Sequence, residues 1–281
     1  MRIIPIELFT DNFCYFIFGK DKQNSILVDP ADHNIVTPFL KRHPEHKITH
    51  ILLTHHHSDH LGKLRLLLKD LKQLYGDNEI QVISGHRDRI KDSNVKIKED
   101  SSFNIGEIKI TTIMTPCHTK GAVVFYLENE DFCNKENEDS MVKAEEIECI
   151  RCVFTGDTLF IGGCGRFMEG NAEQMLENMD KLATLPKDTF VFPGHDYTAE
   201  NLKWAMGIEW ENEAYKKKLE WVENQKKKGL RGIPSKIGEE SEINIFWRTR
   251  NETIKKRVEK ENPIEVMGAL RDMKNRNVCL K

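Results

Sequence analysis

The chain of 281 residues is 39% hydrophobic and 31% charged, a composition typical of a globular protein with one large domain or two. Its formal net charge of −3 gives no whole-chain argument for nucleic acid or membrane as a partner. The seven scattered cysteines do not suggest a disulfide framework, and no apolar run approaches the roughly 20 residues that cross a bilayer. We therefore expect a cytoplasmic protein with free thiols, or an organellar one if a presequence has been removed.

Short apolar runs in the first two thirds of the chain predict strands, and runs with apolar residues at helical spacing predict helices. Strands are expected at residues 3–8, 14–18, 25–28, 48–54, 80–84, 108–114, 122–127, 152–155 and 190–192. Helices are expected at residues 35–42, 64–75 and 172–185. Strands in a run that then alternate with helices predict two sheets with helices packed outside them.

The character of the sequence changes after residue 195. Helical patterns then follow one another, at residues 200–210, 213–228, 252–259 and 263–274. We place a domain boundary here, so that residues 1–195 and 196–281 form separate domains. Within the first domain, residues 128–149 are rich in acidic side chains with almost no apolar periodicity, which predicts a surface insertion between two strands.

The most distinctive stretch reads THHHSDH and follows a predicted strand directly. His55 and His57 are two residues apart, so their side chains point the same way in an extended segment. Asp59 and His60 follow where the chain should turn into a helix. Imidazoles and a carboxylate so close together suit Zn²⁺ or a similar transition ion, although a histidine-rich surface loop is an alternative interpretation.

Three further candidate ligands come after later strands: His118, Asp157 and His195. Gly or Pro stands within two residues before each, which is typical of loops that present a site on a rigid scaffold. With the motif they make five histidines and two aspartates, too many for one tetrahedral ion but suitable for two adjacent ions bridged by a carboxylate. His56 should point away from the other motif histidines and is not expected to be a ligand.

The THxHxDH motif with the later His, Asp and His resembles that of the metallo-β-lactamase superfamily. Within it, four segments look like the glyoxalase II, or hydroxyacylglutathione hydrolase, family: residues 154–170, 194–198, 209–214 and 234–240. The resemblance covers nearly the whole chain. It implies an α+β four-layer αββα sandwich, a metallo-β-lactamase-like catalytic domain over residues 1–195, and an all-helical glutathione-binding domain over residues 196–281.

The family pattern implies a role for each candidate ligand. The implied metal ligands are His55, His57 and His118 for the first ion, Asp59, His60 and His195 for the second, and Asp157 as the bridge. Two divalent ions per chain are expected, with zinc favoured and iron or manganese as alternatives, because His and Asp ligation accepts all three. Asp29, at a predicted strand end before Pro30, would support the ligands or simply form the turn.

The implied reaction is hydrolysis of the thioester S-D-lactoylglutathione, an S-2-hydroxyacylglutathione, to D-lactate and glutathione in the second step of methylglyoxal detoxification. A hydroxide that bridges two ions would attack the carbonyl, since adjacent cations lower the pKa of water. A thiolate with a pKa near ~8.5 can leave without a strong general acid, so no Ser-His-Asp triad is needed. The catalytic residues would be Asp59, His60 and Asp157.

Glutathione is anionic, so its pocket should offer cations and hydrogen-bond donors. The family contacts correspond here to Arg166, Phe167, Met168, His195, Tyr197, Arg271 and Lys274. The last two share one predicted helix face, which without the resemblance would be interpreted as an ordinary solvated surface. Three positions depart from the family pattern, because Met168 replaces a tyrosine, Cys117 a glycine and Asp196 a glutamate.

Other functions stay open for this sequence. A persulfide dioxygenase with a single iron would lack the helical C-terminal part, and a phosphodiesterase or RNA-processing nuclease would need a basic surface for polyanions. A non-enzymatic metal-binding scaffold is disfavoured by the intact ligand set. We expect a monomer that acts on a small-molecule glutathione thioester, with trypanothione-type thioesters as an alternative, and that binds neither nucleic acid nor membrane.

Overall fold

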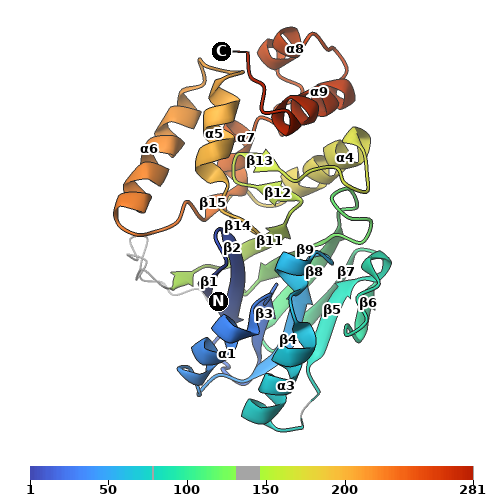
Figure 1. The fold of residues 1–281 in the computed structure, drawn as a ribbon, viewed down its shortest axis with the longest axis vertical. Helices are drawn as coiled ribbons and strands as arrows, with labels where there is room; N and C mark the ends of the chain where they lie inside the picture. Colours follow the sequence, from blue (N-terminus) through green and yellow to red (C-terminus); the bar gives the residue numbers. More distant parts are fainter. Residues whose placement is uncertain (78, 131–145, 281) are drawn as a thin grey trace. The chain divides into compact units, whose positions relative to one another are not determined.

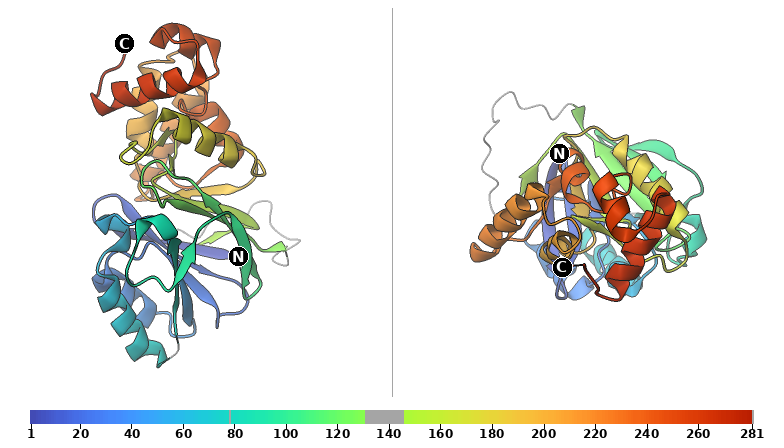
Figure 2. Two further views of the ribbon diagram at one scale, coloured as in Figure 1. Left: turned by 90° about the vertical axis from the view of Figure 1, so that its right-hand side faces the viewer. Right: turned by 90° about the horizontal axis from the view of Figure 1, so that it is seen from above.

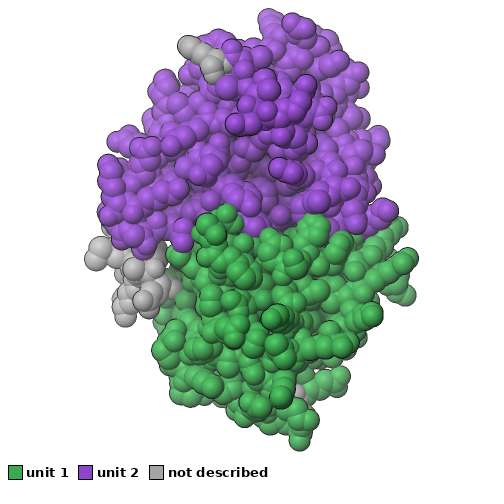
Figure 3. Space-filling model, viewed as in Figure 1, with its two compact units in different colours: residues 1–114, 121–154 green, residues 115–120, 155–281 purple. Residues whose placement is uncertain are grey.

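The computed structural model describes residues 1–77, 79–130 and 146–280, which form two compact units (Figure 3). The first unit comprises residues 1–114 and 121–154, and the second comprises residues 115–120 and 155–281. Most of the predicted acidic insertion lies outside the described residues.

The first unit contains a seven-stranded sheet in the order β10-β1-β2-β3-β4-β5-β6 (Figure 1). Neighbours are antiparallel from β10 to β3 and parallel from β3 to β6. Val28 of β3 lies opposite Leu52 of β4, so the residues that follow these two parallel strands are neighbours. The strands are β1 (Arg2–Leu8), β2 (Asn12–Phe18), β3 (Ser25–Val28), β4 (Ile48–Leu53), β5 (Gln81–Gly85), β6 (Val95–Ile97) and β10 (Ile147–Glu148).

A second sheet and two helices cover the two faces of this first sheet. Every residue of β2 is buried, so both faces of the strand are covered. On one face Phe16 packs in a cluster with helices α1 (His33–Lys41) and α3 (Leu64–Tyr75). On the other face the Tyr15 ring lies 5.1 Å from the ring of Phe154. The first unit is therefore layered as helices, sheet and sheet (Figures 1 and 2).

The second sheet of this unit is antiparallel where its pairing is described, with the order β11-β9-β8-β7. Its strands are β7 (Ser101–Ile105), β8 (Ile108–Met114), β9 (Val123–Glu128) and β11 (Arg151–Gly156), whose last two residues belong to the second unit. A short helix, α2 (Ser58–Leu61), carries the end of the histidine motif.

Helix α3 shows how the sequence pattern determines packing in this unit. Leu64, Leu67 and Leu71 recur at helical spacing and are buried, whereas Lys69 and Lys72 are exposed. Burying each leucine contributes about 2 kcal/mol, which orients the helix with its apolar face against the sheet.

The second unit is mainly helical. Its strands form two short antiparallel pairs, β12 (Leu159–Phe160) with β13 (Gly163–Cys164), and β14 (Phe190–Pro193) with β15 (Ser235–Lys236). Its helices are α4 (Ala172–Ala183), α5 (Thr198–Met206), α6 (Glu213–Lys227), α7 (Ile237–Ile243), α8 (Glu252–Val258) and α9 (Pro263–Asn275). Asn171 and Gln174 form the capping box that starts α4, and α9 packs against α4 and α8.

Each strand and helix expected from the sequence is present, with ends that differ by a few residues. The largest difference is in α5, which was expected over residues 200–210 but ends at Met206, before Gly207. The sequence did not predict several short elements, including α2, α7, β12 and β13, in which few residues are available to establish a periodic pattern.

Candidate active site

The histidine motif begins where β4 ends, beside the end of β3. Asp29, which follows β3, accepts a 2.8 Å hydrogen bond from the Thr54 backbone N–H and a 2.6 Å bond from the Thr54 hydroxyl. These bonds fix the start of the motif. The next residue, His55, is buried, and its Nε2 atom lies 3.1 Å from Nδ1 of His57. The two imidazoles thus converge through nitrogen atoms, as the spacing of two residues predicts.

Asp29 also orients His60. The Asp29 Oδ2 atom lies 2.9 Å from His60 Nδ1, and both side chains are buried. This bond holds the proton on Nδ1 and makes Nε2 the nitrogen suited to bind a metal. Asn12 holds the neighbouring Asp59, because its Nδ2 donates to the Asp59 carbonyl oxygen and Oδ2, each at 3.2 Å. Asp29 thus contacts both Thr54 and His60, in addition to its place in the turn before Pro30.

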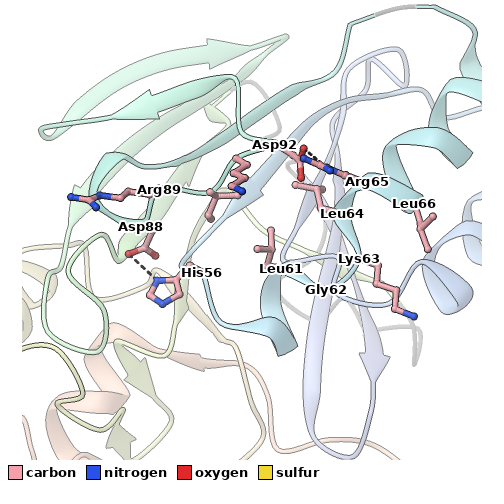
Figure 4. Close-up of a pocket in the computed structure, with 12 residues that line it drawn as sticks. His56, Leu61, Gly62, Lys63, Leu64, Arg65, Leu66, Asp88, Arg89 and Asp92 are labelled. Carbon is pink, nitrogen blue, oxygen red and sulfur yellow. Dashed lines mark hydrogen bonds and ion pairs between the residues drawn. The ribbon is translucent and has the colours of Figure 1, made fainter.

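The His56 side chain is directed toward Asp88, and its ring lies 5.0 Å from that of His57. Its Nδ1 lies 3.3 Å from Oδ1 of Asp88, the last residue of the 3-10 helix η1 (His86–Asp88) (Figure 4). Both residues line a groove of about 610 Å³ in the first unit, with apolar side chains such as Leu61 and Ile90. Among the described residues, none of the groups of side chains that could hold a metal ion includes His56, which was also left out of the predicted ligands.

The second unit brings together the other three candidate ligands. His118 Nε2 lies 3.3 Å from Asp157 Oδ2, and His195 Nε2 lies 3.6 Å from Asp157 Oδ1. One carboxylate thus presents each of its oxygens to a different histidine, which is the arrangement that a bridging ligand requires. The carbonyl oxygen of Arg166 lies 3.0 Å from His118 Nδ1 and so directs the opposite nitrogen, Nε2, toward Asp157.

Aromatic rings hold His195 in place. The Tyr197 ring stacks on the His195 ring with centroids 4.8 Å apart and an interplanar angle of 11°. The Phe160 ring approaches both of them edge-on, 5.8 Å from His195 and 5.1 Å from Tyr197. Tyr197 therefore orients a candidate metal ligand in addition to its predicted contact with substrate.

Arg271 and Lys274 of α9 do not lie on a solvent-exposed face of the helix. Arg271 is buried, and its Nη1 donates a 2.9 Å hydrogen bond to the Cys164 carbonyl oxygen. Lys274 Nζ lies over the Trp204 ring, 4.9 Å from its centroid. Burial, reinforced by the nearby Arg271 charge, lowers the pKa of Lys274 to about 8. The interpretation of this pair as an ordinary exposed surface is therefore wrong.

The predicted substrate residues after β13 are more accessible. Arg166 is exposed, Phe167 is half-buried, and the Met168 side chain is 61% exposed. A side chain at position 168 can therefore reach a bound molecule or remain in solvent without disturbing the core.

The other departures from the family pattern have structural explanations. The buried Cys117 thiol donates to the Asn171 carbonyl oxygen at 3.3 Å, and burial raises the pKa of this thiol to about 12. Burial likewise raises the pKa of Cys164 to about 11, so neither cysteine is an activated nucleophile. Asp196 accepts hydrogen bonds from the backbone N–H groups of Thr198 and Gly232, at 3.4 and 3.1 Å.

Sequence reasoning missed two residues that contact candidate ligands, Asn12 and Phe160. It also missed three residues that bond to the segment between Asp157 and Arg166, namely Asn201, Glu240 and Asn244. Most of these contacts join residues that are distant in sequence, and no local pattern indicates them.

The donor set fits metal ions. Histidine nitrogens and aspartate oxygens are common ligands of zinc and iron, and the nearby Cys117 thiol is engaged with a backbone carbonyl. The sheets, the loops at strand ends and these side chains define the class as a metallo-β-lactamase-type protein, and the family "Metallo-beta-lactamase superfamily" matches residues 9–133. The C-terminal family "Hydroxyacylglutathione hydrolase C-terminus" matches residues 196–277.

Full-length relatives define the family. The chain is 36% identical to "Hydroxyacylglutathione hydrolase cytoplasmic" of Arabidopsis thaliana, over 98% of both chains. It is 33% identical to "Hydroxyacylglutathione hydrolase" of Dictyostelium discoideum, over 98% of this chain and 100% of the relative. The chain therefore belongs to the hydroxyacylglutathione hydrolase family.

Solved structures agree with the predicted fold class. ETHE1 from Myxococcus xanthus superimposes with a TM-score of 0.62 and 22% identity, over 97% of this chain and 91% of that one. With the family matches, this confirms the metallo-β-lactamase fold with a helical C-terminal region. The fold and its His and Asp groups support a dinuclear metal centre. Within the described residues, no helix is both long and apolar enough to cross a membrane.

Proposed function

We propose that the protein hydrolyses S-D-lactoylglutathione to D-lactate and glutathione, and so acts as a hydroxyacylglutathione hydrolase. The observation that carries the proposal is the Asp157 carboxylate, which offers one oxygen to His118 and the other to His195. Family membership over the full chain adds the substrate class, because the named relatives are hydroxyacylglutathione hydrolases.

Seven side chains would hold two divalent ions. One ion would be bound by His55, His57 and His118, the other by Asp59, His60 and His195, with Asp157 as the bridging ligand. Zinc is the metal we expect, and iron or manganese would also suit this donor set. When bound, such a pair of ions lowers the pKa of water and polarises the carbonyl of the substrate.

The chain itself orients these groups. Asp29 holds the Nδ1 proton of His60, Asn12 holds Asp59, and the Arg166 carbonyl fixes His118. Since a thiolate is a good leaving group, with a pKa near ~8.5 for an ordinary thiol, no side chain has to protonate it. Asp59, His60 and Asp157 would thus act by placing the reacting groups rather than as nucleophiles.

Glutathione would bind through residues of the second unit. Its carboxylates would be attracted by the charges of Arg166, Arg271 and Lys274, and Phe167, Met168, His195 and Tyr197 would contact the rest of the molecule. The same cations would disfavour a polyamine-bearing thiol. A thioester of glutathione is therefore a better substrate for this site than a trypanothione-type thioester.

We also propose the organisation inferred from the sequence. Residues 1–195 would be the catalytic domain and residues 196–281 the glutathione-binding domain, which agrees with the range of the C-terminal family match. A monomer in the cytoplasm would suit a small soluble substrate, and the Arabidopsis relative is named cytoplasmic. Nothing in the chemistry of the site calls for nucleic acid as a partner.

The test is thiol release from S-D-lactoylglutathione by the purified, metal-analysed full chain. We expect turnover with two metal ions per chain, abolished in Asp59→Ala and weakened mainly through KM in Lys274→Ala. Arg276→Ala is the matched control, because this exposed cation at the end of the same helix is outside the proposed site. No thiol release from protein that carries two ions would overturn the proposal.

A further inference from the structure

The hairpin of β12 and β13 is too short to be stable by itself. Its ladder consists of two residue pairs, Leu159 with Cys164 and Phe160 with Gly163. An isolated two-stranded hairpin is at best marginally stable in water. Groups elsewhere in the second unit must therefore hold this hairpin in its observed position.

Four buried side chains bond to five successive residues of the hairpin. They come from α5 (Asn201), α7 (Glu240), the residue that follows α7 (Asn244) and α9 (Arg271). The bonds are Asn244 Nδ2 to the carbonyls of Phe160 (3.2 Å) and Gly163 (3.0 Å), Asn201 Nδ2 to the Ile161 carbonyl (3.0 Å), Gly162 N–H to Glu240 Oε2 (3.0 Å), and Arg271 Nη1 to the Cys164 carbonyl (2.9 Å). Every residue from 160 to 164 is thus bound by a side chain distant in sequence.

Glu240 is central to this set. Its Oε2 accepts a 2.9 Å bond from Asn244 Nδ2 in addition to the Gly162 bond, and its Oε1 accepts a 2.6 Å bond from the Ser235 hydroxyl. The side chain is 0% exposed, so removing it would take away the acceptor of the buried Gly162 N–H and of the Ser235 hydroxyl, while Asn244 would keep its bonds to the Phe160 and Gly163 carbonyls. Burial raises the pKa of Glu240 to about 7, so an uncharged group of the same shape is compatible with the site.

The glycines of the hairpin allow the helices to approach this closely. Gly162 has a φ of +69°, and a Cβ on Gly163 would lie 2.6 Å from the Asn201 amide nitrogen. The backbone is therefore held by direct contact and cannot shift without breaking hydrogen bonds.

The hairpin connects groups of the candidate active site. Asp157 precedes it, and Arg166, whose carbonyl fixes His118, follows it. The Phe160 ring within it contacts the rings of His195 and Tyr197. A displaced hairpin would therefore disturb three candidate metal ligands of the second unit together.

We propose that Glu240, acting with Asn244, is a positioning residue that fixes the 160–164 hairpin and thereby the geometry of Asp157, His118 and His195. The bonds of the Glu240 carboxylate are to Ser235, Gly162 and Asn244, so its effect on the three ligands would be transmitted through the hairpin. The inference rests on the proposed function in that it takes these three side chains to be metal ligands.

The test uses two measurements that need no substrate: zinc affinity of the metal-stripped full chain, by competition with a chromophoric chelator, and hydrogen exchange of amides 160–166. In Glu240→Ala we expect zinc binding to weaken about 10-fold or more, as for other residues that orient ligands, and exchange to accelerate. Glu240→Gln should restore both, because its carbonyl oxygen can accept the Gly162 and Asn244 bonds while its amide donates to the Ser235 oxygen.

Glu209→Ala is the matched control. Glu209 is also a buried carboxylate of the second unit, but it bonds to Arg248 and Tyr215 instead of the hairpin. This variant should lose thermal stability and keep its zinc affinity and its exchange at 160–166. If Glu240→Ala does not fold, Asn201→Ala removes a single hairpin bond and should weaken zinc binding in the same direction.

Two results would overturn the inference. The first is wild-type zinc affinity and hydrogen exchange in Glu240→Ala, or in Asn201→Ala if Glu240→Ala does not fold. The second is a loss of zinc affinity in Glu209→Ala equal to that in Glu240→Ala. Failure of the proposed function is distinguishable, because a wild-type protein inactive on the thioester would still give both substrate-free measurements.

Discussion

The Nδ1 atom of His118 lies 3.0 Å from the carbonyl oxygen of Arg166, so one residue links a candidate metal ligand with the predicted substrate loop. The link uses the backbone of Arg166, while its exposed side chain is left to meet a substrate. The two roles of this residue can therefore be separated by a substitution that changes only the side chain.

Arg166→Ala should raise KM for S-D-lactoylglutathione and leave the metal content unchanged. The charge proposed to attract glutathione would be lost, whereas the carbonyl that bonds to His118 would remain. We expect an increase in KM of about 10-fold, the scale of one hydrogen bond to a charged group. Steady-state kinetics and metal analysis of the same preparation measure the two effects.

The control for this change is Arg250→Ala, which removes an exposed arginine paired with Asp180 in the same unit. Its KM should equal that of the wild type. Loss of metal from Arg166→Ala would contradict the assignment of its backbone and side chain to different roles.

Asp157→Asn should lower the metal content below two ions per chain and reduce kcat/KM about 100-fold or more. The substitution would retain one oxygen for one of the two proposed ions and replace the other with an amide N–H₂, which cannot bind a cation. Metal analysis after dialysis is the direct measurement.

Asp180→Asn makes the same chemical change in the exposed Arg250 pair of the second unit. Because surface ion pairs contribute little, this control should match the wild type in metal content and rate. Two firmly held ions in Asp157→Asn would exclude the bridging role.

Asp29→Asn should reduce kcat about 10- to 100-fold through His60, with little change in KM. Asp29 has a φ of +48°, a conformation in which asparagine is well tolerated, so the backbone should stay as it is. The change acts on the bond to His60 Nδ1, since an amide can present N–H₂ where the carboxylate presents an acceptor. Steady-state kinetics of S-D-lactoylglutathione hydrolysis separate kcat from KM.

Asp32→Asn is the control three residues away. Asp32 is the N-cap of α1 and accepts the Asn34 N–H, a role that asparagine fills equally well. Equal kinetics for Asp29→Asn and Asp32→Asn would show that Asp29 only forms its turn.

The lowered pKa of Lys274 predicts that kcat/KM depends on pH. Its pKa is lowered to about 8, first by burial and then by Arg271, so the ammonium is present below pH 8 and is lost as the pH rises through that value. The kcat/KM for an anionic thioester should therefore fall above pH 8, after subtraction of spontaneous hydrolysis. Lys274→Arg should delay this fall, because a guanidinium remains charged.

The exposed Lys203 of α5 supplies the control, since Lys203→Arg should keep the wild-type profile. A profile for Lys274→Arg that coincides with that of the wild type would assign the alkaline decline to another group.

The sequence was sufficient where the relevant geometry is local. The two-residue spacing of His55 and His57 predicted that their rings converge, and the apolar pattern of residues 64–75 predicted α3 and its buried face. The family resemblance added the expected function of residues that the pattern alone could not connect.

Long-range contacts could not be predicted in this way. The burial of Arg271 depends on the Cys164 carbonyl, 107 residues earlier in the chain, and an R-x-x-K pair on a helix otherwise resembles a solvated face. Glu240 bonds to Gly162 across 78 residues, and no local signal distinguishes it from the adjacent Glu239. Tertiary packing, rather than periodicity, determines which of these charges is buried.

Met168→Tyr should lower KM for S-D-lactoylglutathione about 3- to 10-fold with little change in kcat, because it supplies the phenolic hydroxyl that the family resemblance places at this position. The Met168 side chain is 61% exposed, so the larger ring can be accommodated without repacking the core. Met168→Phe is the matched control, since it adds the ring without the hydroxyl. If both variants lower KM equally, apolar contact with the ring is responsible, and the hydroxyl makes no contribution to binding.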